Sequence, residues 1–86
     1  MKELIIYGPY NCPFCSATAK FLINAVQDKV DVMIEAVDNQ PGLISKIQSS
    51  GFKYFPVIAF EDKFYNGIGQ KNLDSIVKLV KSSKDT

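Results

Sequence analysis

The chain has 86 residues, with ten lysines against nine acidic residues and a formal net charge of +1. This length predicts a single domain over residues 1–86, whose core must use most of the apolar segments. The balanced charge argues against a nucleic-acid partner, and no apolar run is long enough to cross a membrane.

The first half of the sequence predicts a strand, a helix and a second strand. Residues 4–7 form a continuous apolar run that ends at Gly8, which is typical of a buried central strand. Apolar side chains then recur mostly every three or four residues over 14–25, which indicates an amphipathic helix with Asn11 as its expected N-cap. Residues 30–37 alternate between apolar and polar side chains, as expected of a second strand.

The second half predicts a short helix, a hairpin and a final helix. Pro41 near the start and Gly51 just past the end bracket the short helix. Residues 57–60 and 64–66 predict two strands joined by a tight polar turn at 61–63. The last apolar face comprises Leu73, Ile76, Val77 and Val80.

The predicted order is therefore βαβαββα, in the α/β class. The first half requires a right-handed crossover between parallel strands. We expect the polar tail at residues 81–86 to fray. Because the sequence starts without a signal-peptide pattern, we expect a cytoplasmic protein.

The chain has two cysteines, Cys12 and Cys15, and no histidine. Without histidine, Cys–His catalysis and His-ligated zinc are excluded. Two cysteines cannot complete a four-thiolate metal site within one chain, so we expect no metal in the monomer. Closing so short a loop gains little entropy, which makes a purely structural disulfide a poor explanation. In a reducing compartment, the remaining interpretation is reversible redox chemistry.

Cys12 and Cys15 lie where the first strand gives way to a helix. Free amide groups at a helix N-terminus stabilise an anion, so we expect a thiolate on Cys12. Cys15, one turn later and more enclosed, would attack a mixed disulfide formed on Cys12. Pro13 fixes the first helical turn. Tyr7, Tyr10 and Phe14 would form an aromatic rim near the thiols. Tyr7 fits the core equally well, and Tyr10 is expected to be exposed in a polar turn.

Two further segments are candidate substrate contacts. Pro56 opens the third strand, and a cis peptide bond there would expose the main chain of Phe55 to an extended substrate. From the residues alone, a trans proline that starts a strand is the commoner case. Gly67 and Gly69 flank Ile68 and would let backbone amides approach a substrate carboxylate or a partner loop. A plain turn explains these glycines nearly as well.

Taken together, Cys12-Pro13-Phe14-Cys15, Phe55-Pro56-Val57 and Gly67-Ile68-Gly69 resemble the glutaredoxin family over essentially the whole chain. The resemblance implies a thioredoxin-like fold, in which a four-stranded mixed sheet is flanked by three helices. It also implies a cis Pro56 and main-chain hydrogen bonds from Phe55 to the substrate. Residues 51–57 and 65–68 look more like the NrdH-redoxins, which are electron donors to ribonucleotide reductase.

The resemblance implies a dithiol electron donor that reduces protein disulfides, with ribonucleotide reductase as the candidate substrate and no tightly bound cofactor. Glutathione-using members carry a lysine before the first cysteine and an acidic pair after the glycines. Residues 8–11 and 70–72 lack both, so glutathione and a thioredoxin-reductase-type flavoenzyme both stay open as the electron source.

Two alternatives to this function stay open. One is a dimer bridged by an iron–sulfur cluster, against which Pro13 beside the first cysteine weighs. The other is a redox-inert binding module of thioredoxin fold. We expect a monomer, because no large exposed apolar stripe is left once the core is filled.

Overall fold

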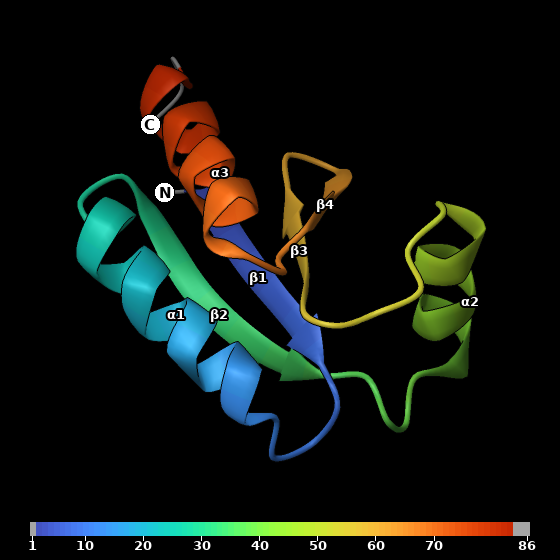
Figure 1. The fold of residues 1–86 in the computed structure, drawn as a ribbon. Helices are drawn as coiled ribbons and strands as arrows, with labels where there is room; N and C mark the ends of the chain where they lie inside the picture. The colour runs from blue at the N-terminus through green and yellow to red at the C-terminus, as the bar shows by residue number, and fades with distance from the viewer. Residues whose placement is uncertain (1, 84–86) are drawn as a thin grey trace.

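The computed structural model describes residues 2–83, which form one mixed sheet and three helices (Figure 1). The elements in chain order are β1 (Lys2–Gly8), α1 (Pro13–Val26), β2 (Val30–Ala36), α2 (Pro41–Ser49), β3 (Val57–Phe60), β4 (Lys63–Asn66) and α3 (Gln70–Ser82). The four strands lie in the order β2-β1-β3-β4, with β2 parallel and β3 antiparallel to the central β1. The predicted βαβαββα order and mixed sheet are confirmed.

The main core lies between the sheet and the helices α1 and α3, which share one face of it (Figure 1). Leu4 and Ile6 of β1 point to this face and are fully buried. Leu22 of α1 and Val80 of α3 meet them, as the apolar spacing of both helices requires. This packing fixes the start of α1 next to the end of β1, where the two cysteines lie.

A smaller core lies on the opposite face, under α2. Its buried members are Tyr7, Val37, Ile47 and Val57. Phe64 contacts Tyr7 and Phe52 through edge-to-face ring contacts, with centroids 6.4 and 6.3 Å apart. Ile47 is the fully buried residue of α2, and the partly buried Leu43 and Ile44 of the same helix also pack against this core.

The second strand is less buried than its alternating pattern predicts. Val30 is buried, but Ile34 is 51% exposed and Ala36 is also exposed. Because β2 is an edge strand, it has a neighbouring strand on one side only, so alternation alone does not bury its apolar side chains.

Several predicted boundaries are wrong, among them the end of β2, which lies at Ala36 rather than at residue 37. Asn11 does not cap α1, because its φ of 58° places it before the helix and Cys12 takes the N-cap position. Lys63 belongs to β4 rather than to the turn. The helix α3 continues through Ser82, into the segment expected to fray, because fully buried Val80 anchors its last turn. The rest of that tail, residues 84–86, lies outside the described part.

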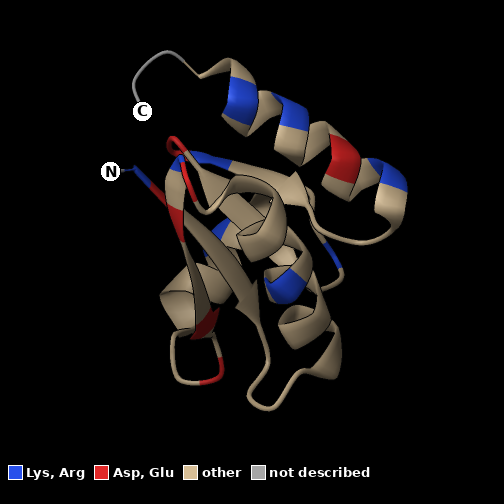
Figure 2. Ribbon diagram, turned by 90° about the vertical axis from the view of Figure 1, so that its left-hand side faces the viewer, with Lys and Arg blue, Asp and Glu red and all other residues tan. Residues whose placement is uncertain are grey.

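No helix in residues 2–83 combines the length and apolar character needed to cross a membrane. In the view of Figure 2, charged residues are distributed over several elements, and lysines and an aspartate follow one another along α3.

Candidate redox site

The sulfur of Cys12 occupies the N-terminus of α1. Cys12 is the N-cap of this helix, and its Sγ accepts a hydrogen bond from the amide of Cys15 at 3.1 Å. Pro13 follows at the first helical position, and the first turn holds no acidic residue. The unpaired amide groups and the positive end of the helix dipole therefore act on this sulfur without a competing carboxylate in that turn.

The two thiols differ in accessibility. Cys12 is half-buried, whereas Cys15 is 1% exposed, and both are free thiols. Burial, followed by the hydrogen bond to Cys12 and the charge of Cys12, raises the pKa of the Cys15 thiol to about 12. Cys12 is thus the sulfur that a substrate can reach, and Cys15 stays protonated behind it at neutral pH.

Gly8, which the sequence analysis did not single out, makes room for both sulfurs. A Cβ atom at this position would lie 2.2 Å from the Sγ of Cys15 and 3.6 Å from that of Cys12. The end of β1 therefore approaches the thiols as closely as a residue without a side chain allows. The one sequence signal for this role of Gly8 is its place at the end of a buried strand, shortly before a cysteine pair.

The peptide bond between Phe55 and Pro56 is cis, as the family resemblance implies. Gly67 donates its N–H to the carbonyl oxygen of Pro56 at 3.0 Å, and a Cβ atom on Gly67 would lie 2.9 Å from that oxygen. Gly69 has a φ of 89°, which favours glycine. Close approach thus explains the first glycine, and backbone conformation explains the second.

A groove of about 390 Å³ lies between the first turns of α1, the segment before β3 and the turn before α3, and Phe14, which lies between the two cysteines in the sequence, lines it. Its walls bring together six of the predicted substrate contacts: Phe14, Phe55, Pro56, Gly67, Ile68 and Gly69. None of the residues that line it carries a charge. Uncharged walls suit an apolar segment of a ligand better than a carboxylate.

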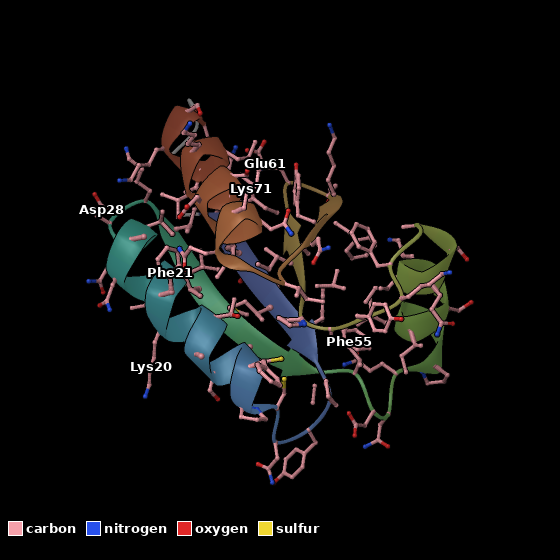
Figure 3. All side chains as sticks on the ribbon, in the orientation of Figure 1. Lys20, Phe21, Asp28, Phe55, Glu61 and Lys71 are labelled. Carbon is pink, nitrogen blue, oxygen red and sulfur yellow. The ribbon has the colours of Figure 1, made fainter. Side chains whose placement is uncertain are left out.

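Phe21, Thr18 and Leu73 also line the groove, although the sequence analysis did not assign them to the site. The apolar spacing of α1 and α3 makes Phe21 and Leu73 look like core residues, so no local signal marks them. Figure 3 shows Phe21 on α1, Phe55 on the chain that leads into β3, and Lys20 projecting away from the rest of the molecule.

Exposed aromatic rings surround the site. Tyr10, as predicted, is 74% exposed, and Phe14 and Tyr54 are almost equally so. Tyr10 does not line the groove; it lies on the loop between β1 and α1, where its amide donates to Asp38. Tyr54, on the segment before Phe55, is a further exposed ring, whereas Tyr7 is buried in the smaller core. A rim formed by Tyr10 and Phe14 near the thiols stays a prediction.

No protein-family model and no curated protein sequence matches this chain. Among solved structures, the chain is similar to the glutaredoxin-like protein NrdH-redoxin from Escherichia coli, reported with a thioredoxin-like activity profile. The two chains are 23% identical, with a TM-score of 0.60, and the match covers 86% of this chain and 93% of that one. This likeness shows the fold, so the predicted thioredoxin-like fold is confirmed.

Proposed function

We propose that this protein is a dithiol–disulfide oxidoreductase that reduces protein disulfides through Cys12 and Cys15. The observation that carries the proposal is the placement of an accessible sulfur at a helix N-terminus, 3.1 Å from the Cys15 amide and in front of a buried second thiol. A structural disulfide would need no accessible sulfur, whereas exchange does.

The proposed reduction transfers two electrons in two exchanges. The thiolate of Cys12 attacks one sulfur of the substrate disulfide, which forms a mixed disulfide and releases the other substrate sulfur as a thiolate that takes up a proton. Cys15 then loses its proton and attacks the Cys12 sulfur. The Cys12–Cys15 disulfide forms, and the second substrate sulfur leaves and is protonated. A dithiol or two glutathione molecules would restore the reduced pair.

The character of the site favours a protein substrate. An uncharged groove and a rim of exposed rings offer contact area to an apolar protein segment but no cationic side chain to a glutathione carboxylate. The likeness to an NrdH-redoxin supports ribonucleotide reductase as a candidate. The proposal includes a monomeric protein of the cytoplasm, with glutathione or a thioredoxin-reductase-type flavoenzyme as its electron source.

Two cysteine variants test the proposal. We expect Cys12→Ser to reduce no insulin disulfide, and Cys15→Ser to accumulate a mixed disulfide on Cys12 that mass spectrometry identifies. Both variants should remain folded by circular dichroism. The proposal would be wrong if Cys12→Ser reduced insulin at the rate of the unaltered protein, or if the unaltered protein never formed the Cys12–Cys15 disulfide in a glutathione redox buffer.

The electron source is identified by a coupled assay of NADPH oxidation with insulin as the substrate. One arm contains glutathione and glutathione reductase, and the other contains thioredoxin reductase. From the uncharged groove, we expect faster turnover with the flavoenzyme. Turnover in the glutathione arm alone would show that glutathione recognition does not need a charged anchor in this groove.

A further inference from the structure

Two hydrogen bonds tie the loop that carries Cys12 to a loop far along the chain. The amide of Tyr10 donates to the Oδ1 atom of Asp38 at 2.9 Å, although these residues are 28 positions apart. The amide of Val37 donates to the carbonyl oxygen of Gly8 at 3.0 Å. The end of β1 and the loop that follows it are thus each held by a hydrogen bond to the segment between β2 and α2.

The loop with Asp38 is itself closed by local hydrogen bonds. The amide of Gln40 donates to the carbonyl oxygen of Val37 at 2.9 Å, and the side chain of Gln40 donates to that of Ala36 at 2.8 Å. Asp38 lies inside this closed turn. These two hydrogen bonds restrict the backbone around Asp38, so its carboxylate is held in place next to the amide of Tyr10.

The surroundings of the loop that carries Cys12 allow few other backbone conformations. The backbone of Gly8 lies directly against the Cys15 sulfur, and Asn11 has a left-handed φ of 58° immediately before the N-cap. A loop that relaxed around Tyr10 would turn Cys12 away from the Cys15 amide, and the 3.1 Å hydrogen bond to the sulfur would lengthen.

We propose that Asp38 is a positioning residue for thiol–disulfide exchange, because its carboxylate oxygen holds the Tyr10 amide and so keeps the Cys12 sulfur over the Cys15 amide. The inference rests on the proposed function. Asp38 acts here as a hydrogen-bond acceptor and not through its charge. An asparagine, whose Oδ1 can accept the same hydrogen bond, should therefore replace it.

The test compares Asp38→Ala, Asp38→Asn and, as a matched control, Asp31→Ala, which removes an exposed carboxylate from β2. We expect Asp38→Ala to slow insulin reduction and Cys12 alkylation by iodoacetamide at pH 7 by about tenfold, the rate equivalent of one ordinary hydrogen bond. The other two variants should stay within about twofold of the unaltered protein, which corresponds to a few tenths of a kcal/mol. The reduced pair of Asp38→Ala should also be oxidised more readily in a glutathione redox buffer.

If Asp38→Ala reduced insulin and was alkylated at the rates of the unaltered protein, the inference would be overturned. Equal losses of rate in Asp38→Ala and Asp38→Asn would also overturn it, because they would assign the effect to the charge of Asp38. If Asp38→Ala does not fold, amide exchange in the unaltered protein decides instead. Slow exchange of the Tyr10 amide supports the inference, and exchange at the rate of an unprotected amide overturns it. Alkylation and amide exchange need no disulfide substrate, so failure of the proposed function would be recognised separately by an absence of insulin reduction.

Discussion

The closest approach in the site is between the backbone of Gly8 and the Sγ of Cys15. A Cβ atom on Gly8 would lie 2.2 Å from this sulfur, which is buried. We expect Gly8→Ala to lower the free energy of unfolding by about 1–3 kcal/mol, as other overpacked cores do. It should also slow formation of the Cys12–Cys15 disulfide. Denaturant unfolding of the reduced protein and the rate of its oxidation by glutathione disulfide measure the two effects.

Gly42 provides the matched control, because nothing lies within 4 Å of a Cβ atom at this position of α2. We expect Gly42→Ala to raise the free energy of unfolding by about 0.5–1 kcal/mol, the usual gain of alanine over glycine in a helix. Its oxidation rate should not change. Equal behaviour of the two variants would show that the approach of Gly8 to the thiols has no energetic consequence.

The buried thiol of Cys15 predicts a loss of stability in alkaline solution. The ordinary pKa of cysteine is 9.0, and burial raises the pKa of Cys15 to about 12, so the unfolded chain loses this proton first. The contribution of Cys15 is therefore complete below pH 9 and is lost as the pH rises from 9 to 12. We expect the stability of reduced Cys15→Ala to fall less steeply over this range than that of the unaltered reduced protein. Parallel curves above pH 9 would contradict the assignment.

The redox pair could be predicted from the sequence because its chemistry is local. A cysteine at a helix start and a second one a turn later are close together in the chain, so the amide of Cys15 lies within reach of the Cys12 sulfur at the N-cap. Gly8 and Asp38 could not be predicted in the same way. Their roles depend on the meeting of β1, α1 and the loop after β2, which only the folded chain defines.

At the level of elements, the two helical layers differ in how firmly they are attached. Helix α1 contributes five buried residues, and Leu22 among them shares the main core with Cys15. Helix α2 contributes Ile47, which packs in the smaller core on the other face. The cysteines therefore depend on the packing of α1 and are separated from α2 by the sheet.

Truncation of one buried residue in each helix tests this division. We expect Ile47→Ala and Leu22→Ala each to lower the free energy of unfolding by about 2–5 kcal/mol, the usual range for a buried aliphatic side chain. Leu22→Ala should also change the rate at which iodoacetamide alkylates Cys12, whereas Ile47→Ala should leave that rate unaltered. Equal changes in alkylation would show that the two cores are coupled through the sheet.

The order of the elements could be predicted because apolar periodicity determines each segment separately, as in α3, whose buried Leu73 and Ile76 lie three residues apart. The position of a strand within the sheet could not. The alternating pattern of β2 is compatible with either a central or an edge strand, and the exposure of Ile34 follows from its edge position. The residue that caps α1 could not be predicted either, because it depends on the backbone conformation of Asn11.

For the whole molecule, the low net charge and the uncharged groove both bear on which substrates it would bind. The net charge is only +1, so long-range attraction of a charged partner should be weak. The groove that Phe14 of α1 helps to line has no charged lining, and the rings of Phe14, Tyr10 and Tyr54 are all highly exposed. We therefore expect selectivity between substrates to depend on the free-energy cost of removing water from the part of the ligand that enters the groove.

Three peptide disulfides that differ only in the residue beside the attacked cysteine test this expectation. We expect kcat/KM to be at least about tenfold higher with leucine at that position than with glutamate or lysine, because an uncharged groove compensates neither charge for its lost hydration. In Phe21→Ala, whose groove admits more water, the kcat/KM of both charged peptides should rise relative to that of the leucine peptide. A preference for one sign of charge over the other would contradict desolvation and indicate a local electrostatic field. Equal values for all three peptides would show that the substrate does not enter the groove.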